Sequence, residues 1–458
     1  MEDMKNGKRS SFSGKLGYVL AAAGASVGLG NIWRFPYLAA KYGGGIFLII
    51  YIVLALTFGY TMIVAETAIG RMTRKSPVGA FKSFGKKKWL SFGGWINAVI
   101  PVLIVPYYSV IGGWVIKYLV EYFRGNAKQL AEDGYFTDFI SNGVSTELCF
   151  MAFCAFTLII IFAGVQNGIE RVSKIMMPIL IVLSVIIAVY SVTRPGALAG
   201  VKYFLVPNVK NFSWMTVVSA MGQMFYSLSI AMGILITFGS YMKKDTAIED
   251  STRNVEVFDT GIAIMAGLMI IPAVFAFSGG DPNTLQAGPS LMFITIPKVF
   301  QNMGFGTVIG IVFFLLVLFA AVTSSIALTE SAVSTFEDEL GWGRKKATVL
   351  VGVIMLALGS LSSLGYGPLA GIKIIGMQFL DLFDFLTNSV MMPIAALLTS
   401  LLVSRVVGID KIEDEIIYGE SAFRRKKVFV VMIKYLCPVF AIIILLSSVA
   451  NALGWIKM

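Results

Sequence analysis

Long apolar stretches alternate with short polar loops along the whole chain. A membrane-spanning helix needs about 20 mostly apolar residues, and the chain contains eleven windows of this kind. The pattern therefore predicts an all-α polytopic membrane protein with about 11 transmembrane helices. The windows are residues 16–40, 44–70, 93–122, 147–164, 172–192, 215–241, 257–278, 305–335, 347–363, 374–404 and 428–455. A further stretch, 286–300, is short and contains prolines, so we interpret it as an external loop.

The first window is interrupted in its middle by residues that weaken a helix. Gly24, Gly28 and Gly30 lie there, and Asn31 and Arg34 follow at once. Inside a bilayer, backbone that leaves a helix is tolerated only around a cavity, an ion or a ligand. Close helix packing is the alternative explanation for the glycines, but the neighbouring amide and guanidinium groups favour a binding site.

The sixth window contains a second interruption, at residues 222–233, with Gln223, Ser227, Ser229 and Gly233. Serine hydroxyls can also bond to their own helix. Two broken helices at corresponding positions of two five-helix halves are nevertheless typical of inverted-repeat transporters with a site near the membrane midplane. The predicted organisation is a single membrane domain, 1–458, with a first repeat at 1–192, a second repeat at 213–405 and a last helix at 428–455.

Composition and charge agree with a membrane protein. Of the 458 residues, 57% are hydrophobic and 14% are charged, a balance foreign to soluble domains. The net charge of +11 could indicate nucleic-acid binding, but the basic residues gather in short loops after alternate windows, as the positive-inside rule requires. We therefore expect no nucleic-acid partner, a multi-pass protein of the bacterial inner cell membrane, a cytoplasmic N-terminus and an external C-terminus. No small-residue cleavage site follows the first window, so we expect a retained span.

The residue types that most enzymes and metal centres require are scarce. The chain has no histidine, and its three cysteines all fall in apolar windows. We therefore expect neither a zinc site nor a disulfide framework. No phosphate-binding loop and no nucleophile–base pair is visible in the sequence, and we predict that the protein is not an enzyme.

Motifs in both broken helices and elsewhere resemble those of the neurotransmitter:sodium symporter family, whose bacterial leucine transporter defines the fold. They are GLGNIWRFPY at 28–37, Tyr107-Tyr108, GQMFYSLS at 222–229, SYMKKD at 240–245, FAAVTSSIA at 319–327, FEDEL at 336–340 and FLDLFDF at 379–385. The motifs occur in order over nearly the whole chain. The resemblance implies a five-plus-five inverted repeat in which helices 1 and 6 are broken.

The resemblance also implies two sodium sites. The first would use the Ser26 carbonyl, the Asn31 side chain, the Ser227 carbonyl and hydroxyl, Asp259 and the substrate carboxylate. The second would use the carbonyls of Gly24, Val27 and Ala320 and the hydroxyls of Thr323 and Ser324. This agrees with the chemistry of sodium, because unwound helices supply the carbonyl oxygens that coordinate it.

For the substrate, the resemblance implies an amino acid. The family's monoamine carriers have an aspartate where this chain has Gly28, so the substrate should bring its own carboxylate to the free N–H groups that follow the break. The expected binding residues are Ala25, Ser26, Leu29, Gly30, Ile104, Tyr108, Tyr226, Ser227, Ser229, Met232, Ser324 and Leu328. Because Met232 is unbranched and adaptable, we expect a bulky hydrophobic or aromatic side chain.

Two gates follow from the same resemblance. Arg34 and Asp384 would close the outer side of the site, and Arg9 and Asp338 would close the inner side. The family usually has tryptophan where this chain has Phe12, which leaves the packing of the inner gate open.

Position 259 indicates how the protein depends on chloride. Chloride-dependent relatives have asparagine where this chain has Asp259, and serine where it has Ala263, whereas Tyr51, Gln223 and Ser227 match the other chloride-lining positions. A carboxylate about 4 Å from sodium is attracted by roughly 4 kcal/mol at an effective dielectric constant of 20, which is enough to replace a bound chloride. We therefore expect no chloride requirement, with a protonated Asp259 as the alternative.

These patterns together predict a sodium-coupled symporter that imports a neutral, bulky hydrophobic or aromatic L-amino acid by alternating access. Its expected partners are the amino acid, two sodium ions and the lipid bilayer, and we expect a monomer or a weak dimer. A channel would need a continuous polar pore, which two broken helices with paired gates disfavour. A non-transporting amino-acid sensor is the alternative that the sequence leaves open.

Overall fold

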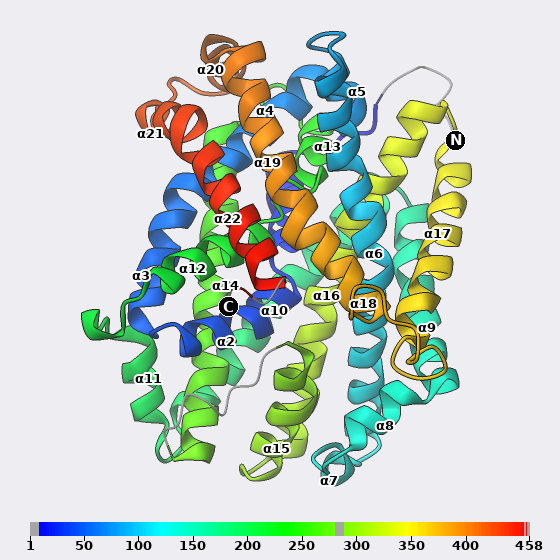
Figure 1. The fold of residues 1–458 in the computed structure, drawn as a ribbon, viewed down its shortest axis with the longest axis vertical. Coiled ribbons are helices and arrows are strands. Elements are labelled where there is room, and N and C mark those ends of the chain that lie inside the picture. The colour runs from blue at the N-terminus through cyan, green and yellow to red at the C-terminus, as the bar shows by residue number, and fades with distance from the viewer. Residues whose placement is uncertain (1–8, 280–287, 453–454, 456–458) are drawn as a thin grey trace.

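The computed structural model describes residues 9–279, 288–452 and 455, and these residues form an all-helical bundle (Figure 1). Within the described residues, nine helices are long and apolar enough to cross a membrane, and a bent helix pair counts as a tenth. The prediction of an all-α polytopic membrane protein is confirmed. Residues 286–287 of the predicted loop and 453–454 of the last predicted helix lie outside the described residues.

The first five predicted windows correspond to helices that are continuous or interrupted by π-helical turns. They are α1 (Lys15–Ser26), η2 (Gly30–Arg34) and α2 (Phe35–Lys41); α3 (Gly45–Leu54), η3 (Ala55–Gly59) and α4 (Tyr60–Thr73); α6 (Lys88–Phe123); α9 (Gly143–Phe162); and η4 (Val165–Glu170) with α10 (Arg171–Val192). The α1 and η2–α2 halves meet at an angle of 53°. The third helix begins before its predicted window because Lys88 and the residues after it form its first turns.

The other six windows also correspond to helices. They are α12 (Trp214–Ser227) with α13 (Ile234–Ser240); α14 (Ile248–Ser278); α16 (Gly306–Leu340); α17 (Arg344–Leu364); α18 (Phe379–Asp384), η8 (Phe385–Met391), α19 (Met392–Leu401) and η9 (Leu402–Val407); and α21 (Lys426–Val431), η10 (Met432–Leu436) and α22 (Cys437–Ala452). With 14 and 7 residues, α12 and α13 are each too short to span a bilayer. The sixth predicted window is therefore one helix broken into two pieces.

Short helices lie in the connections. They are α5 (Pro77–Lys82), α7 (Ala127–Leu130), α8 (Tyr135–Ser141), α11 (Ala197–Leu205), η5 (Val209–Asn211), η7 (Leu291–Thr295), α15 (Ile296–Gln301) and α20 (Ile409–Ile417). The described part of the stretch at 286–300 contains η7 and α15, which together form one helix, Leu291–Gln301, that is too short to span a bilayer. Its external position stays a prediction. Pro297 follows the π-helical turn η7 within this helix, and a local π-helical turn of this kind can accommodate a proline. Figure 1 shows α5 and α20 at one end of the bundle and α7, α8 and α15 at the other.

The first break lies where α1 ends. The Val27 amide still donates to the Ala23 carbonyl, but Val27 itself leaves the helical conformation, with φ −75° and ψ 89°. The chain resumes when the Asn31 amide donates to the Gly28 carbonyl at 3.1 Å. The Asn31 side-chain oxygen in turn accepts a hydrogen bond from the Gly28 amide at 3.2 Å. Asn31 therefore provides hydrogen-bond partners for both the carbonyl and the amide of Gly28 at the break.

The second break, between α12 and α13, contains left-handed backbone at alternate residues. Ser229, Ala231 and Gly233 have φ of 51°, 59° and 70°, and such strain in a non-glycine residue costs about 1–3 kcal/mol. Two contacts hold the segment in place. The Ala231 amide donates to Glu66 Oε1 at 2.7 Å, and the Ser229 hydroxyl donates to the Ala25 carbonyl at 2.9 Å. The second bond joins the two breaks directly.

Two long helices flank the breaks and position the site. The 36 residues of α6 and the 35 residues of α16 pack along each other. The Tyr118 and Tyr122 rings of α6 lie 5.2 and 5.4 Å from the Phe314 ring of α16. Gly310 allows this approach, because a Cβ atom there would be 2.1 Å from the Tyr122 ring.

Candidate functional site

A buried cavity of about 30 Å³ lies between the two breaks, α6 and α16. Its lining consists of Ala25, Ser26, Gly28, Leu29, Gly30, Asn31, Ile104, Tyr108, Tyr226, Ser229, Met232, Ser324 and Leu328. All the predicted substrate-binding residues except Ser227 therefore line this one cavity. The Ser227 hydroxyl faces Asp259 instead. The space holds roughly two water-sized spheres. An amino acid can enter only if side chains such as Tyr226 and Met232 move outward.

Glycines shape the side of the cavity that faces the first break. A Cβ atom on Gly28 would lie 2.6 Å from the Ser324 hydroxyl and 3.1 Å from the Tyr108 hydroxyl, and one on Gly30 would lie 2.3 Å from the Tyr226 ring. The Leu29 amide donates to the Tyr108 hydroxyl at 3.3 Å. Backbone N–H groups at the start of a helix, next to a phenol, form a donor set suited to a carboxylate.

The predicted first ion site is a fully buried hydrogen-bond network centred on Asp259. Asn31 Nδ2 donates to Asp259 Oδ1 at 2.8 Å, and Tyr51 donates to Oδ2 at 2.9 Å. The Ser227 hydroxyl donates to both carboxylate oxygens, at 2.9 and 3.1 Å. The Ser26 hydroxyl donates to the Ala22 carbonyl, and the use of the Ser26 carbonyl as a ligand stays a prediction. The network brings together Asn31, Ser227 and Asp259, and it includes Tyr51.

The predicted second ion site lies between the end of α1 and the middle of α16. The Ser324 hydroxyl approaches the carbonyls of Gly24 at 3.2 Å and Val27 at 3.5 Å. The Thr323 hydroxyl approaches the Ala320 carbonyl at 3.2 Å. The oxygens of all five predicted residues thus lie near one another at this place, and none of them carries a formal charge.

On the inner side, the predicted gate pair is closed. Arg9 forms an ion pair with Asp338 at 2.5 Å and donates to the Ser240 hydroxyl at 3.0 Å. The Arg9 guanidinium also lies over the Tyr241 ring, 5.1 Å from its centroid. Phe12, which is 1% exposed, packs edge-on against Tyr241 with 6.1 Å between ring centroids. Phenylalanine at this position therefore packs tightly beside the Arg9–Asp338 pair, and the gating role of this pair stays a prediction.

On the outer side, the predicted pair is not joined. Asp384 accepts hydrogen bonds from Tyr107 at 3.2 Å and from Asn388 at 2.5 Å. Arg34 instead lies over the Tyr226 ring, 5.3 Å from its centroid. No Arg34–Asp384 ion pair forms in the part of the chain that the structure describes. The gating role of this pair stays a prediction.

Some polar residues at the site did not emerge from the motifs. Asn388 holds Asp384, and Glu330 accepts from Tyr241 at 2.7 Å and from both terminal nitrogens of Arg344. Glu330 is fully buried. A buried acidic residue inside an apolar window is itself a signal of function, and it would have indicated Glu330 from the sequence.

A multi-pass helical protein in which two broken helices enclose a buried polar cavity has the architecture of a secondary transporter. The model of the sodium:neurotransmitter symporter family matches residues 9–131 and 120–455, which together span most of the chain. The chain therefore belongs to the sodium:neurotransmitter symporter family. It is a sodium-dependent transporter and not an enzyme, as the sequence predicted.

Relatives from distant organisms support this assignment. An uncharacterized sodium-dependent transporter of Bacillus subtilis, YhdH, is 34% identical over 97% of this chain and 99% of its own length. An uncharacterized sodium-dependent transporter of Methanocaldococcus jannaschii, MJ1319, is 31% identical over 89% of this chain and 84% of its own. The human sodium- and chloride-dependent GABA transporter 2 is 26% identical over 90% of this chain and 76% of its own.

Among solved structures, the crystal structure of MhsT in complex with L-phenylalanine is similar. It has a TM-score of 0.86 and 34% sequence identity, and the match covers 96% of this chain and 100% of MhsT. This likeness agrees with the fold that the motifs implied.

Proposed function

We propose that this transporter imports a neutral, bulky hydrophobic or aromatic L-amino acid together with two sodium ions, by alternating access and without chloride. The observation that carries the proposal is the cavity between the two broken helices, whose donors suit a carboxylate and whose walls are apolar. The 34% identical MhsT, solved with L-phenylalanine, supports an aromatic substrate. The N-terminus would be cytoplasmic, as the distribution of basic loops favours.

The contacts of Gly28 support an amino acid over an amine. A side chain at this position would collide with Ser324 and Tyr108, so no protein carboxylate can reach the cavity from here. The ligand must then supply the negative charge that faces the backbone N–H groups after the break. The remaining walls, including Ile104, Met232 and Leu328, are hydrophobic and favour an apolar side chain.

Two sodium ions would supply enough energy for accumulation. Moving one charge through 100 mV yields about 2.3 kcal/mol, and a tenfold concentration gradient adds about 1.4 kcal/mol per ion. Two ions therefore supply roughly 7 kcal/mol. The two clusters of oxygens at the breaks, one around Asp259 and one around Thr323 and Ser324, are the proposed binding places.

The substrate class can be tested by equilibrium binding. Purified protein in sodium buffer is given radiolabelled L-phenylalanine and a competition panel of the twenty amino acids, tyramine and dopamine. Leucine, phenylalanine, tyrosine and tryptophan should compete, whereas the two amines should not, because they lack the carboxylate. Strong competition by tyramine or dopamine would show that the carboxylate argument is wrong. Replacing sodium by potassium serves as the control and should abolish specific binding.

Alternating access distinguishes the transporter from a sensor. A sensor would bind the amino acid with sodium but would not move it across a membrane. Arg9→Ala removes the inner ion pair, so we expect the inner side of the site to become more accessible to a thiol reagent at an introduced cysteine. Lys82→Ala, which removes the exposed ion pair with Glu339 at the same end of the protein, is the matched control. Equal accessibility in both variants would count against the inner gate.

A further inference from the structure

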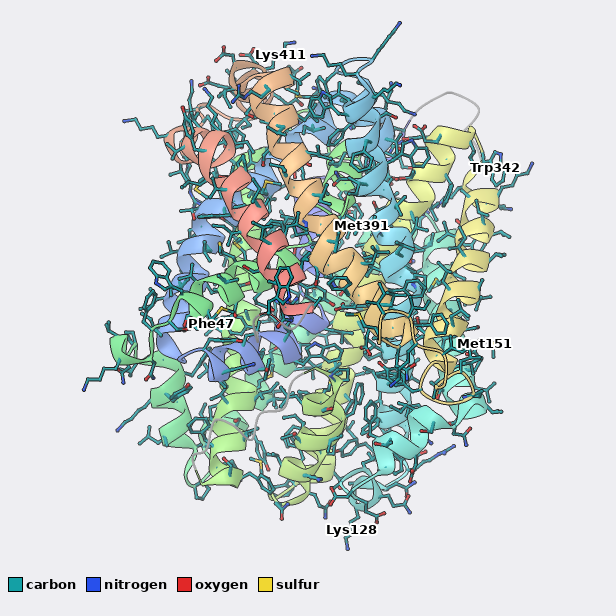
Figure 2. The ribbon with its side chains drawn as sticks, in the orientation of Figure 1. Phe47, Lys128, Met151, Trp342, Met391 and Lys411 are labelled. Atoms are coloured by element: carbon teal, nitrogen blue, oxygen red, sulfur yellow. The ribbon has the colours of Figure 1, made fainter. Side chains whose placement is uncertain are left out.

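A second cavity, a groove on the flank of the bundle, lies away from the transport site. It has a volume of about 440 Å³ and is formed where the beginning of α9 meets the end of α17 and the residues after it. Its lining includes Val144, Glu147, Leu148, Met151, Leu364 and Pro368. Figure 2 shows Met151 at the outer flank of the molecule. Cavities of roughly 300–1,000 Å³ are the usual size of small-molecule sites.

Glu147 is the one acidic residue of this lining, and half of its carboxylate has no partner. Oε1 accepts a hydrogen bond from the Ser360 hydroxyl at 2.5 Å. Oε2 is buried and has no hydrogen-bond partner among the described residues. Asn142, which also lines the cavity, accepts with its side-chain oxygen from the Ser145 amide as the cap of α9, and its side-chain NH2 group does not donate to Glu147 Oε2. A carboxylate oxygen in apolar surroundings is costly unless a donor or cation reaches it.

The position of the cavity in the bundle restricts what can reach Glu147. Gly143 begins α9 and Leu364 ends α17, so both lie at the same end of membrane-spanning helices. This is the depth of the lipid headgroups. Val144 is 73% exposed and Leu148 is 59% exposed, and with Met151 they continue the wall along α9 toward the membrane interior. A ligand here therefore meets a carboxylate at headgroup depth and an apolar wall below it.

We propose that this groove binds an aminophospholipid, with the primary ammonium of a phosphatidylethanolamine headgroup donating to the Glu147 carboxylate after a side-chain rotation that turns Oε2 toward the groove, and an acyl chain lying against Val144, Leu148 and Met151. The charge of Glu147 favours a cationic group and disfavours the headgroup of an anionic lipid such as phosphatidylglycerol. A primary ammonium carries N–H donors that a quaternary choline lacks. Choline is usually held by aromatic cages, and none of the described residues that line this groove is aromatic.

The test uses the full-length protein in lipid nanodiscs, with bound lipids measured by native mass spectrometry after mild delipidation. We expect the wild type to retain phosphatidylethanolamine about tenfold more than phosphatidylcholine, the ratio expected for one charge-assisted hydrogen bond. Glu147→Gln should remove this preference, whereas Ser360→Ala, which leaves the carboxylate in place, should keep it. Sodium-dependent phenylalanine binding reports that each variant is folded. Equal retention of both lipids by the wild type would overturn the proposal.

A second measurement does not depend on any variant. Mono-, di- and trimethylated phosphatidylethanolamines are compared on the wild type, and retention should fall as N–H donors are replaced by methyl groups. Free ethanolamine at millimolar concentration should not displace the lipid, because it lacks the acyl chain. Retention that is independent of methylation, stronger retention of phosphatidylglycerol, or displacement by ethanolamine would each contradict the assignment.

Discussion

At the first predicted ion site, the Asp259 carboxylate accepts hydrogen bonds from Asn31, Ser227 and Tyr51, whereas the second predicted site consists of neutral carbonyl and hydroxyl oxygens. Both sites adjoin the broken first helix and both are buried. The first joins the two broken helices to α14, and the second joins the first break to α16. Ion binding at a site with a carboxylate depends mainly on the charges around it. Ion binding at a site of neutral oxygens depends mainly on how closely the helices bring those oxygens together.

This difference indicates which site determines the ion requirements of the transporter. The first site contains the Asp259 carboxylate, and we propose that its negative charge holds a cation without a bound anion. The second site has no such charge, and its oxygens come together only when α1 packs against α16. We therefore expect charge-removing changes to have their largest effect at the first site, and loss of a single neutral ligand at the second site to have a smaller one.

The largest effect should come from Asp259→Asn. Removing an attraction of roughly 4 kcal/mol should reduce sodium-driven uptake of phenylalanine by about 100-fold or more in chloride-free medium. Ala263→Glu, one helical turn along α14, should partly restore uptake in the double variant. Asp250→Asn is the matched control, since this exposed aspartate on the same helix pairs with Lys15 away from the site. Normal uptake by Asp259→Asn without chloride would refute the role of the carboxylate.

Asn31→Ala should have the next largest effect. It removes a predicted ligand and a hydrogen bond to a charged group, each lost bond of this kind costing about 1.5–3 kcal/mol. We expect the sodium concentration for half-maximal uptake to rise about tenfold or more. The titration is run beside Asn302→Ala, which changes an asparagine of the connection between α15 and α16. An unchanged sodium dependence in Asn31→Ala would remove it from the ligand set.

Thr323→Ala tests the neutral site. The loss of one uncharged hydroxyl, worth about 1 kcal/mol, should raise the sodium requirement about fivefold. Thr323→Ser keeps the hydroxyl and should behave like the wild type, which separates the ligand from the methyl group. If Thr323→Ala raised the requirement more than Asn31→Ala does, the proposed contrast between the two sites would be reversed.

Tyr51→Phe should have the smallest effect of the series. Asp259 would lose the hydrogen bond to its Oδ2 from Tyr51 but would keep those from Asn31 and Ser227. Tyr51 is not a predicted sodium ligand, and the remaining donors keep Asp259 in place, so only part of the about 1.5–3 kcal/mol of such a bond should be lost. We expect uptake to fall about threefold, with chloride still unnecessary. A new chloride requirement in Tyr51→Phe would show that the phenol, and not the carboxylate, sets the anion independence.

Much of this arrangement could be predicted because it depends on local chemistry. The breaks follow from glycines within apolar windows and from Asn31, and the motifs around them identified the residues that the structure gathers at the cavity. The same local reasoning did not predict a helix around Pro297, which follows a π-helical turn inside the helix Leu291–Gln301. Proline usually breaks a helix interior, but a local π-helical turn can accommodate it, and hydrophobic periodicity and composition alone do not predict such a turn.

Other features depend on tertiary contacts that no local pattern contains. Arg34 lies over the Tyr226 ring rather than in an ion pair with Asp384, whose carboxylate accepts from Tyr107 and Asn388. Ser227 does not line the cavity, and its hydroxyl donates to Asp259 instead. The groove at Glu147 arises between α9 and α17, helices that are far apart in the chain. Predicting it requires knowing which helices are neighbours.

The most direct test of the account is gradient-driven uptake of labelled phenylalanine into proteoliposomes, with the anion and the cation exchanged independently. With an inward sodium gradient, the account predicts the same accumulation in chloride as in gluconate on both sides of the membrane. Accumulation should disappear when potassium or choline replaces sodium. Uptake that stops in gluconate would contradict the role of Asp259, and equal uptake in choline would contradict sodium coupling itself.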